Sequence, residues 1–468
     1  MTATSVDFLV IGGGPGGYTA ALHAAHLGRS VTLVDRRGDA GLGGVCLHEG
    51  CIPTKALLHL ADRASEFGHF ADAGLRASGA QVDLEAFQQW KQQLIVRLSD
   101  GVRRLLAAAG VQVLSASARF SGPRQVALTD PEGGKTTMEF TDAVLATGSR
   151  PLAPDGLTID GAVVLDSTTA LELTQVPPSM VLVGGGSVGM ELGAAFAKLG
   201  TQLTIVEQAD QILPQLDPVL VRPLRRRLGQ LGVQVITGGT VTDHGEGRAL
   251  VRTAAGEQQV AAARILAGVG RRPNTEQLNL GAAAIDVGDD GFLTPAPDRR
   301  VAPHVAAIGD LTPGPFHAHK AGAEARVAAA ALSGRSASFD LTAVPFIAHA
   351  DPEVASVGLT VAQAADAGVE VRTAQFPLSG SGWAVALGAA FGYAQLVIEA
   401  GTDVVRGVHM VGPHATELIG EGALAVQMRA TVQDLTRAVH AHPTLSEQLP
   451  EAAHLADGTP VHVSRRRN

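Results

Sequence analysis

Short apolar runs alternate with glycine-rich turns and alanine-rich segments at the start of the chain. The apolar run 8–11 predicts a buried strand, the glycines after it predict a tight turn, and the segment 20–25 predicts a helix. A second apolar run, 31–34, predicts another strand that ends at Asp35. This order of strand, glycine turn, helix and strand is typical of a βαβ unit with parallel strands.

The same order of elements returns in the middle of the chain. Residues 180–183 and 203–207 predict two strands, and residues 191–199 predict the helix between them. Asp35 and Glu207 each lie 23 residues after the first glycine of their turn (35 − 12 and 207 − 184). Both turns have the form Gly-x-Gly-x-x-Gly, with the glycines Gly12, Gly14, Gly17, Gly184, Gly186 and Gly189.

Each residue of this pattern suits a dinucleotide. The first glycine permits the tight turn, the second lets a pyrophosphate approach the backbone, and the third lets the helix pack on the strand. The acid accepts hydrogen bonds from a ribose hydroxyl. Tight turns without a nucleotide are the alternative, but two complete copies favour two dinucleotides, and electron transfer between FAD and a nicotinamide is an obvious reason for both. No basic residue follows Glu207 in 208–210, which favours NAD over NADP at the second turn.

Composition narrows the class of protein. The length of 468 residues allows two to four domains at about 100–200 residues each. The net charge of −9, with 45 acidic and 36 basic side chains, argues against a nucleic-acid partner. The chain has neither an apolar stretch of membrane-spanning length nor a secretory signal, so we expect no membrane association and a cytoplasmic location.

The chain has two cysteines, Cys46 and Cys51, which are too few for a disulfide-rich scaffold or a structural zinc site. They follow the first βαβ unit and precede a predicted helix over 55–63. A helix N-terminus favours a thiolate, so we expect a lowered thiol pKa. The two thiols are alternatively inert, or bind a metal with His48, although no further ligand lies nearby in the sequence. We favour a redox-active disulfide beside a flavin and expect no metal.

The segment 42–55 resembles the active-site motif of the flavin disulfide reductases. Within this family it is most similar to the dihydrolipoamide dehydrogenases, the E3 components of 2-oxo acid dehydrogenase complexes. Other matching stretches follow in the family's order and cover nearly the whole chain: 145–151, 268–275, 307–310, 318–321 and 440–447.

The resemblance implies an α/β fold with two Rossmann-like dinucleotide-binding domains and a C-terminal α+β dimerisation domain. We expect an FAD-binding domain over 1–149, an NAD-binding domain over 150–271, a central segment over 272–341 that completes the FAD domain, and an interface domain over 342–468. It also implies a homodimer and a lipoylated partner, either an E2 acyltransferase or another lipoyl-carrier protein.

The resemblance also implies roles for single residues. Cys46 exchanges with a dithiol substrate, Cys51 contacts the flavin ring, and His442, supplied by the partner subunit and oriented by Glu447, accepts a proton. Imidazole suits this role because its pKa lies near neutrality. Lys55 lies near the flavin and pairs with Glu191. Besides the first turn and its acid, the implied FAD contacts are Lys55, Ala118, Gly148, Asp310 and Ala318. Besides the second turn and its acid, the assigned NAD contacts are Glu191 and Gly270.

Two other kinds of function remain open at this point. One is another flavin disulfide reductase. Relatives of glutathione reductase usually have a lysine where Thr54 stands, and mercuric reductases carry a further cysteine pair, whereas this chain has no third cysteine. A non-enzymatic flavoprotein scaffold or redox sensor has no need of the thiol and histidine sets. The sequence departs from the family at His48-Glu49, which replaces Asn-Val, and in 379–388, which lacks an arginine.

Overall fold

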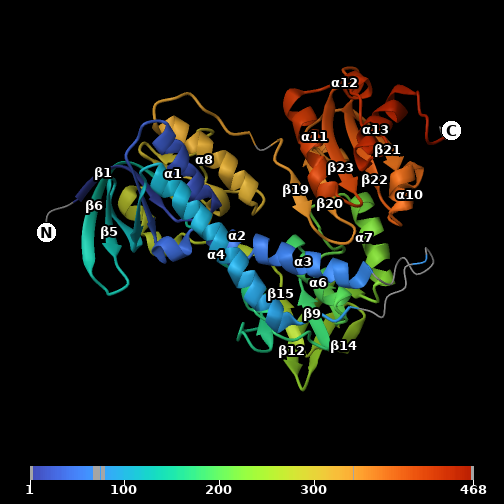
Figure 1. Cartoon of the computed structure of the whole chain (residues 1–468), viewed down its shortest axis with the longest axis horizontal. Helices are drawn as coiled ribbons and strands as arrows, with labels where there is room; N and C mark the ends of the chain where they lie inside the picture. The colour runs from blue at the N-terminus through green and yellow to red at the C-terminus, as the bar shows by residue number, and fades with distance from the viewer. Residues whose placement is uncertain (1–3, 67–73, 75–79, 341, 465–468) are drawn as a thin grey trace. The chain divides into compact units, whose positions relative to one another are not determined.

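The computed structural model describes residues 4–66, 74, 80–340 and 342–464. The chain forms two compact units, each assembled from three stretches of sequence, and Figure 1 labels their elements. Unit 1 comprises Met1–Ala56, Glu85–Leu152 and Gly270–Leu341, and unit 2 comprises Leu57–Leu84, Ala153–Val269 and Thr342–Asn468. None of the helices among the described residues is long and apolar enough to cross a membrane.

Unit 1 is built on a sheet with the strand order β17-β18-β6-β1-β2-β3, in which β1, β2, β3, β6 and β18 run parallel. The antiparallel strands β4 and β5 join it beside β6, and β7 pairs with β16 separately. The strands are β1 (Thr4–Ile11), β2 (Val31–Asp35), β3 (Gln112–Ser115), β4 (Ser117–Gly122), β5 (Gln125–Thr129), β6 (Lys135–Leu145), β7 (Ser149–Pro151), β16 (Arg271–Pro273), β17 (Arg300–Ala302) and β18 (Val305–Ala307).

The apolar run of β1 shows no alternation with polar residues, because its side chains enter two different cores. Phe8 and Val10 belong to the core that contains α1 (Pro15–His26) and α8 (Ala318–Leu332), which pack side by side (Figure 1). Leu9 and Ile11 belong to a second core on the opposite face of the sheet. Both faces are covered, so every side chain of the run is buried, as in other parallel sheets.

The helices after β2 differ from the sequence prediction. The structure has α2 (Gly44–His48), α3 (Cys51–Glu66) and α4 (Leu84–Ala108). The prediction that the helix begins at residue 55 is wrong, because α3 begins at Cys51. Pro53 lies in the first turn of α3, where an amide hydrogen has no partner within the helix, so the proline does not interrupt it.

The middle part of unit 2 repeats the plan of unit 1. A parallel sheet with the order β11-β10-β9-β15-β8 is accompanied by the antiparallel sheet β12-β13-β14. The elements are β8 (Val164–Leu165), α5 (Ser167–Ala170), β9 (Ser179–Val183), α6 (Ser187–Lys198), β10 (Gln202–Glu207), α7 (Pro218–Gln230), β11 (Gln234–Thr237), β12 (Gly239–Gly245), β13 (Arg248–Thr253), β14 (Gly256–Ala261) and β15 (Arg264–Ala267).

The C-terminal part of unit 2 has an antiparallel sheet in the order β19-β20-β23-β22-β21, and helices α11 and α13 pack on it. Its elements are β19 (Phe346–Ala348), β20 (Val354–Gly358), α9 (Val361–Asp366), β21 (Val371–Pro377), α10 (Gly382–Ala386), β22 (Tyr393–Glu399), β23 (Val405–Val411), α11 (Ala415–Met428), α12 (Val432–Arg437) and α13 (Gln448–Asp457). The architecture confirms the predicted fold class of two doubly wound sheets and a C-terminal α+β part.

Candidate functional site

The first glycine turn, between β1 and α1, is shaped by two of its three glycines. Gly12 has φ +108°, and a Cβ atom there would lie 2.3 Å from the carbonyl oxygen of Ala146. A Cβ atom at Gly17 would lie 1.8 Å from the carbonyl oxygen of Gly12. At Gly14, in contrast, the nearest atom is the Cα of Gly44 at 3.9 Å. The fold itself requires Gly12 and Gly17, whereas the space beside Gly14 fits a pyrophosphate.

The second turn, between β9 and α6, has the same division of roles. Gly184 has φ +95°, and its Cβ atom would lie 2.6 Å from the carbonyl oxygen of Gly268. A Cβ atom at Gly189 would lie 2.7 Å from Leu182, but one at Gly186 would meet its nearest atom only at 3.6 Å. Gly186, the middle glycine, is again the position where the fold leaves room for a Cβ atom.

The two acids hold their turns through the same pair of hydrogen bonds. One oxygen of Asp35 accepts a hydrogen bond of 2.8 Å from the amide of Gly13. Its other oxygen accepts one of 2.9 Å from the amide of Arg37. Glu207 accepts from the amide of Gly185 at 2.6 Å and likewise from the amide two residues on at 2.7 Å. This contact between the acid and the turn was not predicted from the sequence. Each oxygen keeps a second lone pair, which suits a ribose hydroxyl.

The helices after the turns present free amide groups toward the same region. Gly14 is the N-cap of α1 and Gly186 is the N-cap of α6, and neither residue has a side chain that can accept from the first-turn amides. These amides and the positive end of the helix dipole favour an anion. Both turns therefore fit the phosphates of a dinucleotide.

The cysteine pair lies in unit 1, directly after the first βαβ unit. Cys46 lies in α2, Cys51 is the first residue of α3, and both side chains are partly buried. The hydrogen bond with Cys51, burial and the charge of Cys51 raise the pKa of Cys46, while the nearby Lys55 acts in the opposite direction. The expected lowering of the thiol pKa is therefore wrong for Cys46. The reason is that the helix N-terminus belongs to Cys51, and Cys46 hydrogen-bonds to that second thiol.

The two unusual residues between the cysteines have their own partners. The Nε2 atom of His48 lies 2.9 Å from the carbonyl oxygen of Leu42. Glu49 forms an ion pair of 2.7 Å with Arg37. His48 is thus engaged with the backbone, which favours a structural role, and the negative charge of Glu49 is balanced beside the thiol pair.

Asp310 lies in a 3-10 turn, Gly309–Leu311, just after β18. Ser149 donates a hydrogen bond of 2.6 Å to one oxygen of Asp310, and Arg271 donates one of 2.7 Å to the hydroxyl of Ser149. This chain orients the carboxylate of Asp310. Neither Ser149 nor Arg271 was predicted from the sequence to have a role, although each directly follows a glycine of the predicted cofactor sets, Gly148 or Gly270.

The remaining predicted flavin and NAD contacts are spread over several elements. Ala118 pairs with Leu128 across β4 and β5, and Ala318 opens α8. Gly148 (φ +69°) and Gly270 (φ +118°) occupy turns that only glycine adopts readily. Their contacts with FAD and NAD stay predictions.

Glu191 lies in α6, two residues after Gly189, and its side chain is buried at 6% exposure. Its carboxylate accepts a hydrogen bond of 2.9 Å from the amide of His349. The predicted pairing of Glu191 with Lys55 joins residues of different units and stays a prediction.

His442 and Glu447 form a pair near the C-terminus. The Nδ1 atom of His442 lies 2.8 Å from one oxygen of Glu447, whose other oxygen accepts from the amide of Thr444 at 2.9 Å. Burial acts to raise the pKa of Glu447, but the hydrogen bonds from Thr444 and His442 outweigh it and lower that pKa. The His442 side chain is 74% exposed, so its imidazole can exchange a proton with a second molecule.

Two dinucleotide folds and a hydrogen-bonded thiol pair define a class of redox proteins that pass electrons between two nucleotide cofactors and a disulfide. The chain belongs to the pyridine nucleotide-disulphide oxidoreductase family, whose model matches residues 6–325. Residues 344–453 match the dimerisation domain of the same family, which supports a homodimer.

Individual relatives are similar over the full length of the chain. The dihydrolipoyl dehydrogenase of Geobacillus stearothermophilus is 38% identical over 466 residues, covering 98% of each chain. The dihydrolipoyl dehydrogenase of Halobacterium salinarum is 40% identical over 475 residues, covering 99% of each chain. Among solved structures, LpdA from Mycobacterium tuberculosis superposes with a TM-score of 0.88 at 27% identity, over 96% of this chain and 99% of its own.

Proposed function

We propose that the protein is an NAD-dependent dihydrolipoyl dehydrogenase, which oxidises protein-bound dihydrolipoamide to lipoamide through Cys46 and Cys51. The observation that carries this proposal is the hydrogen-bonded thiol pair placed directly after the first dinucleotide fold, in a chain that contains a second such fold. The full-length similarity to two enzymes named dihydrolipoyl dehydrogenase supports the choice of substrate.

Unit 1 would hold FAD and the second turn would hold NAD. The space at Gly14 and Gly186, the open first-turn amides and the two acids fit these groups. The FAD set is Gly12, Gly14, Gly17, Asp35, Lys55, Ala118, Gly148, Asp310 and Ala318, and the NAD set is Gly184, Gly186, Gly189, Glu191, Glu207 and Gly270. Bound FAD would supply an acceptor for the electron pair of the dithiol, and bound NAD⁺ would supply the final acceptor.

The domain roles follow the same assignment. We propose that residues 1–149 with 272–341 form the FAD-binding domain, 150–271 the NAD-binding domain and 342–468 the interface domain. The match of the dimerisation model to residues 344–453 and the change of unit after Leu341 support the last limit. Leu57–Leu84 departs from this division, because it clusters with unit 2.

The thiol chemistry begins with the Cys46–Cys51 pair oxidised to a disulfide. The partner subunit's His442 accepts the proton of a substrate thiol, and Glu447 stabilises the resulting imidazolium through the 2.8 Å contact. The substrate thiolate attacks Cys46, the disulfide bond breaks, and Cys51 leaves as a thiolate. Its place at the N-terminus of α3 favours that negative charge.

The second half of the exchange completes the oxidation. The other substrate thiol attacks the mixed disulfide, and its proton passes to the Cys46 sulfur that it displaces, so that lipoamide is released and Cys46 is left as a thiol.

The substrate dithiol would arrive on a lipoylated E2 acyltransferase or another lipoyl-carrier protein. A cytoplasmic location is proposed with it, because a close cysteine pair that works as a dithiol suits a reducing compartment.

A steady-state assay with dihydrolipoamide and NAD⁺ tests the proposal, and NADH should form. Anaerobic reduction should also produce the long-wavelength absorption band of a thiolate against a flavin. Cys51→Ser should abolish the band, and an unchanged band in that variant would contradict the assignment of Cys51. A yellow protein without activity would favour the non-enzymatic scaffold or redox sensor instead.

A further inference from the structure

Three charged side chains lie buried in the core of unit 1, outside the thiol and histidine sites. Glu324 is 0% exposed, Lys320 is 1% exposed and Arg299 is 8% exposed. Arg299 forms an ion pair of 2.9 Å with Glu324, and the ammonium of Lys320 lies 3.6 Å from the other oxygen of Glu324. These three residues are called the buried charge cluster below.

The buried charge cluster holds both polar groups of Gly309. The amide of Gly309 donates a hydrogen bond of 2.6 Å to Glu324, and Lys320 donates one of 2.8 Å to the carbonyl oxygen of Gly309. Gly309 has φ +68° and directly precedes Asp310. The backbone immediately before Asp310 is therefore fixed by two opposite charges.

The same two side chains also hold the far end of the turn. The hydroxyl of Thr312 donates to Glu324 at 3.0 Å, and Lys320 donates to the carbonyl oxygen of Thr312 at 3.1 Å. Asp310 lies between Gly309 and Thr312, so the segment that carries it is clamped on both sides.

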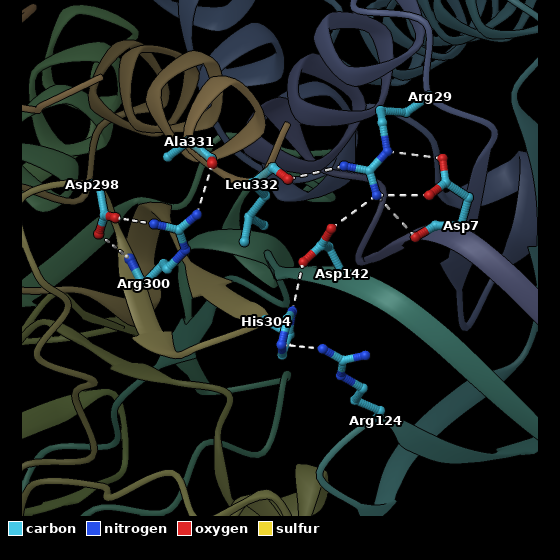
Figure 2. A network of polar contacts seen from close by, with 9 residues as sticks. All are labelled: Asp7, Arg29, Arg124, Asp142, Asp298, Arg300, His304, Ala331 and Leu332. Atoms are coloured by element: carbon cyan, nitrogen blue, oxygen red, sulfur yellow. Dashed lines mark hydrogen bonds and ion pairs between the residues drawn. The ribbon is translucent and has the colours of Figure 1, made fainter. Parts of the chain in front are cut away.

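Helix α8, which carries Lys320 and Glu324, is anchored at its other end as well. Arg29 donates a hydrogen bond of 3.0 Å to the carbonyl oxygen of Leu332, and Arg300 donates one of 2.7 Å to that of Ala331 (Figure 2). Arg29 is in turn paired with Asp142 at 2.9 Å and with Asp7 at 2.7 Å, and these acids lie on β6 and β1. The C-terminal end of α8 is thus tied to the sheet, while Lys320 and Glu324, nearer its N-terminal end, hold the turn that carries Asp310.

Burying such charges is costly, and apolar side chains of similar size often serve stability as well or better. Burial lowers the pKa of Lys320, against the opposing effects of the charges of Glu324 and Asp310. Stability alone therefore does not explain the buried charge cluster. Its hydrogen bonds fix the backbone on both sides of Asp310 and so fix the position of this residue.

We propose that Lys320 and Glu324, supported by Arg299, are positioning residues that hold the Asp310 carboxylate in place for FAD and thereby set the affinity for this cofactor. The inference rests on the proposed flavin role of Asp310. Ser149 and Arg271 fix the side chain from one direction, and the buried charge cluster fixes the backbone beneath it.

The test is the titration of the FAD-free full-length protein with FAD. Lys320→Met and Glu324→Gln should each weaken FAD binding by about tenfold or more, since each removes a charged hydrogen bond to Gly309. Thr312→Val, which keeps the shape and removes only the hydroxyl, should give a smaller loss in the same direction. It keeps the test decisive if the charge variants do not fold.

Asp142→Asn is the matched control, because it removes a buried ion pair at the other end of α8 without touching Gly309. It should lower the melting temperature of the FAD-free protein but leave the FAD dissociation constant within about twofold of the wild-type value. The inference is overturned if the cluster variants bind FAD as tightly as Asp142→Asn does. If the wild-type protein itself does not bind FAD, the proposed function fails instead.

Discussion

At the scale of single residues, the glycines of the two turns do different things. A Cβ atom at Gly17 would overlap the carbonyl oxygen of Gly12 at 1.8 Å, whereas one at Gly14 would meet nothing closer than 3.9 Å. The first kind of glycine is needed by the polypeptide alone. A glycine such as Gly14 instead leaves a space that a ligand can occupy. Replacing each glycine with alanine, which adds one methyl group, distinguishes the two cases.

We predict that Gly17→Ala destabilises the protein by about 3 kcal/mol or more, because backbone atoms cannot move away from the new methyl group. Gly14→Ala should keep nearly the wild-type stability of the FAD-free protein and weaken FAD binding at least about tenfold. Thermal unfolding of the FAD-free variants and FAD titration measure the two effects. Equal losses of stability in both variants would show that the two glycines are not distinguished in this way.

Glu207 is the residue that combines a structural contact with a proposed binding contact. It accepts from the amide of Gly185 and is placed to meet a ribose hydroxyl at the end of β10. The sequence predicted the second contact from spacing. The first requires the fold, because the two residues lie 22 positions apart in the chain.

Glu207→Gln should raise the KM for NAD⁺ about tenfold, since a hydrogen bond to a charged acceptor contributes about 1.5–3 kcal/mol. The FAD content should not change, because the second turn lies in unit 2 and the first in unit 1. Asp210→Asn, at an exposed acid three residues further on, is the control and should leave the KM unchanged. Steady-state kinetics with varied NAD⁺ decide the matter.

At the scale of elements, the strands were easier to predict than the ends of the helices. The apolar runs 8–11, 31–34, 180–183 and 203–206 predicted β1, β2, β9 and β10, because every side chain of these runs is buried. The start of α3 could not be read in this way. Pro53 is compatible with a loop and equally with the first turn of a helix, and only packing decided that the helix begins at Cys51.

The C-terminal sheet contains a buried histidine that the sequence analysis did not single out. His409 on β23 is 1% exposed, with Nδ1 2.8 Å from the hydroxyl of Ser356 and Nε2 3.1 Å from the carbonyl oxygen of Leu359. Burial lowers its pKa from 6.5 to about 4. The unfolded chain therefore binds this proton more readily than the folded one, and the stabilising contribution of neutral His409 is fully present above pH 6.5 and is lost toward pH 4.

We predict that His409→Gln flattens the loss of stability between pH 6.5 and 4. The wild-type loss due to this group is about 3 kcal/mol, from a pKa difference of about 2.5 units. Melting temperatures across this range measure it. His59→Gln, at an exposed position of α3, should keep the wild-type slope, and a wild-type slope in His409→Gln would contradict the prediction.

At the scale of the whole molecule, the proposed site would combine groups from two chains. The thiol pair belongs to unit 1 and the His442–Glu447 pair to unit 2, and the family's dimerisation domain covers residues 344–453. The resemblance implies that each thiol pair works with the histidine of the other subunit. This arrangement makes every subunit of a homodimer a donor to one site and the host of another.

Co-expression of Cys46→Ser with His442→Ala tests this arrangement, because each variant alone should be nearly inactive. Random pairing makes half of the dimers mixed, and each mixed dimer then has one complete site out of two, so about a quarter of the wild-type activity should return. Activity no higher than that of the single variants would place both groups of a site in the same subunit. The size of the purified protein in solution confirms that dimers formed.

The sequence alone determined the features that depend on short spacing. These are the two glycine turns, the acid 23 residues after each turn, the thiol pair five residues apart and the His442–Glu447 pair. Local spacing is sufficient there because a strand, a turn and a helix fix the positions of residues that follow one another closely.

The tertiary structure decided what joins distant parts of the chain. The acids hold the turns, Ser149 and Arg271 orient Asp310, and the buried charge cluster clamps Gly309. It also decided that Cys46 is hydrogen-bonded to Cys51, which reversed the expected direction of its pKa. Such contacts depend on burial and on which groups meet across the core. The spacing of residues along the chain determines neither of these.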